Sequence, residues 1–169
     1  MRVSARVCTR VDKTDLLQLI IAQLAHDLEV IFTAAKTAHE ASTHEENIPD
    51  NKYDTLALEA SYVAQGQANR ANEIRKSIEI YKQLTPRVTD NDTVRMTSLV
   101  TLEAVDGTTK RVFIGPAEGG LRIACQGKEI VVITGGSPMG RELLGKSVGD
   151  SVEIEARASR MEYEIVEVS

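Results

Sequence analysis

The sequence predicts an α+β protein, in which an N-terminal antiparallel pair of long helices precedes a small antiparallel β domain with one short helix. Two patterns support this class. Up to about residue 84 the apolar residues recur in alternating steps of three and four, which is the period of a packed helix. From residue 94 onward they alternate with polar residues, which is the period of a strand. We therefore expect a coiled-coil arm at residues 12–85 and a β domain at residues 92–169.

The two predicted helices each carry one apolar seam. The first seam consists of Leu17, Ile21, Leu24, Leu28, Ile31, Ala35 and Ala38, and the second of Ala57, Ala60, Ala64, Gln67, Ala71, Ile74, Ile78 and Tyr81. Pairing the seams from opposite ends gives position numbers that sum to 98 or 99, for example Leu17 with Tyr81. The helices should therefore fold back on each other near residue 49, where Pro49 favours a turn.

The ends of these helices follow from capping residues. Asp12 or Thr14 can cap the first helix, which should run to about Thr43. Asp50 or Asn51 can cap the second, which must end before Pro86.

Side-chain size changes along the seam. Large residues lie at the base and alanines lie near the turn, so the two backbones should approach closely there. Gly66 lies in the middle of the second helix, and the pairing rule places it nearly opposite Phe32. We expect this glycine to make room for the Phe32 ring.

The turn of the arm, near residues 45–54, is acidic. Residues 39–54 contain five carboxylates and a single lysine, which gives a local charge of about -4. They are Glu40, Glu45, Glu46, Asp50 and Asp54, against Lys52. Exposed acidic clusters are often simply solvated. At the end of a thin arm, however, Glu45, Glu46, Asp50 and Asp54 are candidates to share Mg²⁺ with a partner's site and polarise a water for attack on phosphate.

The histidines beside this turn do not form a metal motif. His39 and His44 are five residues apart, whereas two zinc ligands on one helix face are four apart. We therefore expect no metal bound permanently by this chain.

The C-terminal half reads as a series of short strands. The expected elements are strands at 94–102, 110–114, 121–125, 130–133, 151–156 and 161–168, with an Asp106-Gly107 hairpin turn. Ser137 should cap a short helix with Pro138 at its first position, and Gly145 should close it. The result is a mostly antiparallel sheet with one helix packed on it.

Composition limits the classes of function. The formal net charge of -5 argues against general binding to nucleic acid, which requires a basic surface. Cys8 and Cys125 have neither metal nor redox spacing, which is typical of a reduced cytoplasmic protein. The apolar run at 16–21 is too short to span a bilayer, and residues 1–10 lack the apolar core of a signal peptide. We therefore expect a cytoplasmic protein without a membrane partner.

The sequence contains no GxGxxG motif. We therefore expect that the protein is not itself an enzyme and has no cofactor of its own.

Residues 137–152, SPMGRELLGKSVGDSV, followed by Tyr163-Glu164-Ile165-Val166, resemble the C-terminal signature of the Gre family (GreA/GreB) of bacterial transcription elongation factors. The order of helical hairpin and small β domain extends this resemblance to nearly the whole chain. It implies an FKBP-like C-terminal lobe that docks on RNA polymerase, with Ser137, Pro138 and Met139 contributing to docking. It also implies that the arm enters the polymerase's secondary channel and modulates elongation, with Mg²⁺ shared at the polymerase active site and only indirect contact with the nascent RNA.

The chain departs from the family at the tip. Family members that stimulate transcript cleavage carry an Asp-Leu-Ser-Glu-Asn run, whereas this chain has Glu45-Glu46-Asn47-Ile48-Pro49-Asp50. Two versions of the function therefore stay open: a factor that stimulates cleavage by the polymerase in backtracked complexes, and a secondary-channel regulator without cleavage activity.

Two other classes of protein fit the sequence less well. An FKBP-type prolyl isomerase needs an aromatic-lined pocket, and the C-terminal half offers only Phe113 and Tyr163. A dimerising scaffold would pair the arm with a second copy, whereas the internal pairing of the two seams predicts a monomer.

Overall fold

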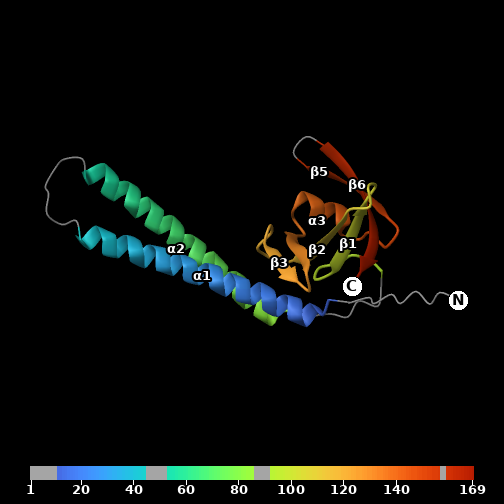
Figure 1. The fold of residues 1–169 in the computed structure, drawn as a ribbon, viewed down its shortest axis with the longest axis horizontal. Helices are drawn as coiled ribbons and strands as arrows, with labels where there is room; N and C mark the ends of the chain where they lie inside the picture. The colour runs from blue at the N-terminus through green and yellow to red at the C-terminus, as the bar shows by residue number, and fades with distance from the viewer. Residues whose placement is uncertain (1–10, 45–52, 86–91, 157–158) are drawn as a thin grey trace. The chain divides into compact units, whose positions relative to one another are not determined.

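The computed structural model describes residues 11–44, 53–85, 92–156 and 159–169 (Figure 1). Over these residues the chain forms three helices and six strands. They are α1 (Lys13–His44), α2 (Tyr53–Gln83), β1 (Leu99–Ala104), β2 (Thr109–Gly115), β3 (Arg122–Cys125), β4 (Lys128–Thr134), α3 (Pro138–Leu143), β5 (Ser151–Ala156) and β6 (Ser159–Val168). The predicted α+β class, with a helical hairpin followed by a small β domain and one short helix, is confirmed.

The chain divides into two compact units. One unit is Ile21–Leu84, and the other combines Met1–Ile20 with Thr85–Ser169. The first two turns of α1 therefore belong to the same unit as the sheet, although the sequence pattern assigns them to the arm. Asp12 begins this helix, because its Oδ1 accepts a hydrogen bond from the Thr14 N–H at 2.7 Å.

The helical unit is held by apolar side chains at its base. Leu24 of α1 and four residues of α2 are buried there, namely Ala71, Ile74, Ile78 and Tyr81. Burial fades along α1, since Leu28 and Ile31 are half-buried while Ala35 and Ala38 are exposed. Figure 1 shows the two ribbons further apart towards the end where α1 stops and α2 begins. The expected close approach of the alanine end is therefore wrong, because alanines remove too little apolar area from water to hold two helices together.

The contact between α1 and α2 at Phe32 also differs from expectation. The Arg75 guanidinium lies 5.0 Å from the centre of the Phe32 ring, a cation–π arrangement. Gly66 does not make room for this ring, because a Cβ at Gly66 would have nothing within 4 Å. The explanation of Gly66 from residue pairing is therefore wrong.

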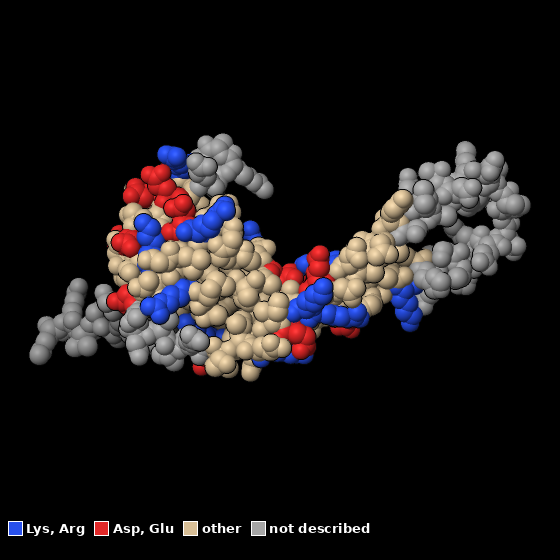
Figure 2. Space-filling model, turned by 180° about the vertical axis from the view of Figure 1, so that it is seen from behind, with Lys and Arg blue, Asp and Glu red and all other residues tan. Residues whose placement is uncertain are grey.

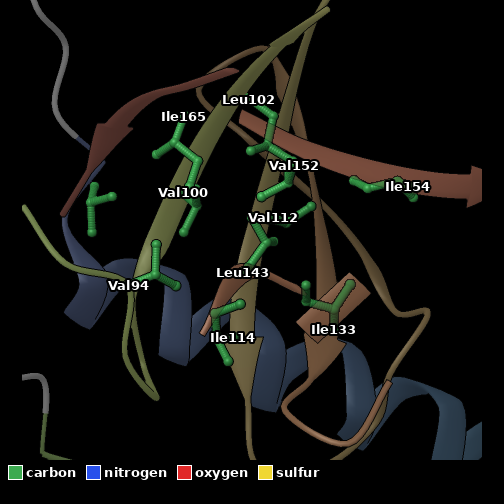
Figure 3. Packing of buried hydrophobic residues seen from close by; sticks show 11 residues of the cluster. Val94, Val100, Leu102, Val112, Ile114, Ile133, Leu143, Val152, Ile154 and Ile165 are labelled. Atoms are coloured by element: carbon green, nitrogen blue, oxygen red, sulfur yellow. The ribbon is translucent and has the colours of Figure 1, made fainter. Parts of the chain in front are cut away.

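The second unit is built on one six-stranded sheet with the order β3-β4-β2-β1-β6-β5. Four neighbouring pairs are antiparallel, as expected, and one pair, β2 with β4, is parallel, with Phe113 opposite Val132. On one face, α3 covers a buried cluster to which Val100, Leu102, Val112, Ile114, Leu143, Val152 and Ile165 belong (Figure 3).

The other face of the sheet is also buried. Phe113 alternates with Val112 and Ile114, so it points away from α3, yet it is only 1% exposed. Leu16 and Ile20 of α1 are fully buried and belong to the same unit. The first turns of α1 and this face of the sheet therefore lie in one unit.

The strand expected at 94–102 begins only at Leu99. Residues 95–98 form a tight turn, in which the Ser98 Oγ accepts a hydrogen bond from the Arg95 N–H at 3.0 Å. Thr97 takes a φ of +68°, a conformation that no regular strand contains. Val94 is buried although it lies outside the strand. The alternation of apolar and polar residues therefore predicted a strand that starts too early.

Helix α1 bears on the question of a membrane. Its stretch Lys13–Ala38 is long and apolar enough to cross a bilayer by length and composition. We expected no membrane span because the apolar run at residues 16–21 is short, but this run is only part of the longer apolar stretch. Core helices of soluble proteins have the same properties, and Leu16, Leu17, Ile20 and Leu24 within this stretch are buried.

Candidate functional site

The loop before α3 is the part of the predicted docking region that the structure describes in atomic detail. Ser137 caps α3: its Oγ accepts a hydrogen bond from the Gly140 N–H at 3.0 Å and donates one to the Thr134 carbonyl oxygen at 2.7 Å. Pro138 follows at the start of the helix, where its missing N–H costs no hydrogen bond. The predicted cap is confirmed, and it ties the start of α3 to the end of β4.

Gly140 makes this arrangement possible. A Cβ placed on Gly140 would lie 2.0 Å from the Thr134 carbonyl oxygen, a backbone atom that already accepts the Ser137 hydroxyl and N–H. Only glycine allows the helix to approach β4 this closely. In this loop Pro138 is exposed and Met139 is half-buried.

A hollow of about 290 Å³ lies beside this loop, between α3 and the β5–β6 hairpin, and we name it the hairpin hollow. It is lined by Pro138, Met139, Arg141 and Glu142 of α3 and by Glu153, Ile154 and Arg160 of the hairpin. Of the three predicted docking residues, the structure thus places Pro138 and Met139 in the wall of one concave site, while Ser137 holds the wall in position.

The hairpin side of the hollow was not found from the sequence. Glu153, Ile154 and Arg160 follow α3 by ten or more residues, and only the pairing of β5 with β6, Glu155 opposite Arg160, brings them together. Gly140 was also missed as a functional position. Its place three residues after Ser137 was the one available signal, because the N–H bonded by a capping serine lies there.

Charged side chains gather on the same part of this unit, as Figure 2 shows for one face. Glu153 lies directly opposite Glu162, and Glu103 lies directly opposite Glu164. Like charges in such pairs oppose each other. Arg160 relieves one pair, since its Nη1 lies 3.4 Å from the Glu153 Oε2.

The carboxyl group of Asp106 has a lowered pKa. The side chain and backbone N–H of Thr108 donate hydrogen bonds to Asp106 and hold the pKa of its carboxyl below the ordinary value. Asp106 lies in the β1–β2 turn with Gly107 at a φ of +81°, as the Asp-Gly pattern predicts. This shift belongs to the turn and not to the hairpin hollow.

The acidic tip is a different matter. Glu45, Glu46 and Asp50 lie outside the described residues. Asp54 falls within the first turn of α2, where only the backbone is described. Their proposed role in directing Mg²⁺ therefore stays a prediction. Among the described residues, no three His, Cys, Asp or Glu side chains are grouped so that they could hold a metal ion.

Known proteins resemble this chain as follows. Residues 89–169 match the family model described as transcription elongation factor, GreA/GreB, C-term. The transcription elongation factor GreA of Desulfovibrio desulfuricans (strain ATCC 27774 / DSM 6949 / MB) is 29% identical over 152 residues, covering 88% of this chain and 85% of that protein.

Two solved structures are similar at lower identity. GreA factor homolog 1 (Gfh1) of Thermus thermophilus is 18% identical, with a TM-score of 0.39 and coverage of 92% of this chain and 93% of that chain. Gfh1 of Thermus aquaticus is 19% identical, with a TM-score of 0.40 and coverage of 87% and 92%.

Proposed function

We propose that this chain is a Gre-like transcription elongation factor, and that it binds RNA polymerase through its C-terminal domain, which matches the GreA/GreB model at residues 89–169, and modulates elongation. The family match carries the proposal, because it extends over all six strands and α3. The loop at Ser137, Pro138 and Met139 lies within it, and Pro138, next to the capping Ser137, is exposed.

The arm would have a role separate from docking. In our proposal, α1 and α2 enter the secondary channel of the polymerase and carry Glu45, Glu46, Asp50 and Asp54 towards its active site. There the carboxylates would help to hold a Mg²⁺ ion shared with the polymerase, and the polymerase itself would hydrolyse the backtracked RNA. The factor would then contact the nascent RNA only indirectly and would work as a monomer.

RNA shortening in halted, backtracked complexes tests this proposal. The tip variant replaces Glu45, Glu46, Asp50 and Asp54 with alanine. A matched control replaces Glu73 and Glu79, two exposed carboxylates elsewhere on α2. We expect the wild type and the control to shorten the RNA and the tip variant to bind without shortening it. Equal shortening by the tip variant would contradict the role of these carboxylates.

The sequence of the tip supports a second version of the function. Because Glu45-Glu46-Asn47-Ile48-Pro49-Asp50 replaces the acidic run of cleavage-stimulating members, the arm could occupy the channel without promoting hydrolysis. In that case the wild type would compete with other channel-binding factors and change pausing, while the RNA in backtracked complexes would keep its length.

A further inference from the structure

We propose that Phe32 of α1 and Arg75 of α2 form a brace that holds the two helices of the arm together beyond their buried base, and that the arm needs this brace to act on RNA polymerase. This inference rests on the proposed function and deepens it, because it assigns two positioning residues to the arm. Neither residue would touch the reacting atoms, since both would act through the helices that lead to the acidic tip.

The need for a brace follows from where burial stops along the arm. Leu24 of α1 and Ile74 of α2 are almost completely buried, so apolar packing joins the helices at their level. Beyond Ile31, the described side chains of α1 up to Ala38 are all exposed. On α2 the side chains of residues 62–70 are exposed as well, apart from the half-buried Gln67. Burial of apolar area therefore stabilises this part of the arm only weakly.

The contact between Phe32 and Arg75 connects the buried level of the arm with the exposed one. Phe32 lies eight residues beyond Leu24, about two helical turns, whereas Arg75 adjoins Ile74. Side chains lean towards the N-terminus of their own helix, so Phe32 leans towards the base of the arm and Arg75 leans away from it. The Arg75 guanidinium carbon consequently lies 5.0 Å from the centre of the Phe32 ring. This diagonal contact opposes separation of the two helices.

The guanidinium of Arg75 is also held by its own helix. Its Nη1 donates a hydrogen bond to Asn72 Oδ1 at 3.2 Å, one turn earlier on α2. Phe32 is 47% exposed, so its ring gains less from burial than a phenylalanine in a core. At an exposed site a cation over an aromatic ring changes an equilibrium constant by a factor of about two to five. Such a factor matters where the described side chains provide no buried core.

Hydrogen exchange in the full chain tests the brace without polymerase. Phe32→Leu keeps an apolar side chain but removes the ring, and Arg75→Gln removes the charge. We expect each change to speed exchange in α1 beyond Ile31 about two- to fivefold. The double variant should exchange no faster than either single variant, because both changes remove the same contact.

Two further variants show whether the ring and the charge matter in themselves. Phe32→Tyr keeps an aromatic face and should exchange as the wild type does. Lys76→Gln is the matched control for Arg75→Gln, because Lys76 is an exposed cation next to Arg75 on the same helix. Helix propensity alone would not speed exchange in Phe32→Leu, since leucine is the better helix former. Additive effects of the two single changes, or unchanged exchange in both, would overturn the brace.

The same variants test the role of the brace in halted, backtracked complexes of RNA polymerase. Because docking is proposed for the C-terminal domain, the factor concentration that gives half of the maximal effect should stay as in the wild type. The maximal effect itself, measured as the rate of RNA shortening or as the change in pausing, should fall about two- to fivefold in Phe32→Leu and Arg75→Gln. Phe32→Tyr should restore it.

The outcomes distinguish this inference from the proposed function. A wild type that changes neither RNA length nor pausing contradicts the proposed function, and exchange in the free chain then decides whether the brace exists. Variants that exchange faster but keep the full maximal effect overturn the role of the brace in the polymerase. So does a raised half-effect concentration with an unchanged maximum, because Phe32 and Arg75 would then serve binding and not the position of the tip.

Discussion

Gly140 is the residue at which a single methyl group should matter most. Because its Cβ would lie 2.0 Å from the Thr134 carbonyl oxygen, Gly140→Ala must push α3 away from β4 or break the Ser137 cap. We expect the free energy of unfolding to fall by about 2–4 kcal/mol, the range of severe backbone strain and overpacking. Urea unfolding followed by circular dichroism measures this change.

Gly136→Ala is the control for this substitution. A Cβ on Gly136 would meet nothing within 4 Å, so the same chemical change should leave the free energy of unfolding within about 0.5 kcal/mol of the wild type. If both variants lose equal stability, the tight approach at Gly140 is not what holds the loop.

For single residues, the sequence predicted the roles that depend on hydrogen bonds to residues nearby in the chain. Ser137 and Pro138 cap and start α3 as expected, because a cap depends on atoms only three residues away. The contact of Arg160 with Glu153, and their place beside Met139, depends on how β5 and β6 pair and on where α3 packs. Such long-range contacts leave no periodic signal in one sequence.

Gly66 of α2 leads to a prediction about the stability of the helical unit. It lies in the interior of α2, is exposed, and would have no neighbour for a Cβ. Gly66→Ala should therefore stabilise the helical unit by up to about 1 kcal/mol, because alanine restricts the unfolded chain and favours the helix. Thermal unfolding followed at 222 nm measures the gain.

The reverse exchange at a neighbouring position serves as its control. Ala68 is also exposed on α2, so Ala68→Gly should lower stability by a similar amount. A loss of stability in Gly66→Ala would mean that the glycine is needed for a close contact after all.

The elements themselves were predictable where one face of a helix or strand is buried. The helix boundaries near Lys13, His44 and Gln83 agree with the caps and with Pro86. The parallel pairing of β2 with β4 was not predictable, because strand order depends on how β3 crosses over and not on alternation within a strand. The prediction that the alanine ends of the two helices approach closely was also wrong. A heptad pattern shows which face of a helix is apolar, but the size of its side chains decides whether that face is buried.

At the scale of the whole molecule, the division of α1 between two units is the main departure from the sequence pattern. The seam is continuous from Leu17 onward, so nothing in its period marks a boundary after Ile20. Which unit the first turns of α1 join is decided by long-range packing, and the local apolar pattern does not show it.

This division predicts that two similar substitutions on one helix weaken different parts of the protein. Leu16 and Leu24 are both fully buried leucines on α1, but Leu16 belongs to the unit with the sheet and Leu24 to the helical unit. Each change to alanine should cost about 2–5 kcal/mol in its own unit. Hydrogen exchange resolved along the chain measures where protection is lost.

We expect Leu16→Ala to speed exchange in β1, β2 and β4, and Leu24→Ala to speed it in α2 between Ala71 and Tyr81. Each variant is the control for the other, because the residue type, the helix and the exposure are the same. If Leu16→Ala instead loosened α2 and left the sheet protected, the first turns of α1 would belong to the arm.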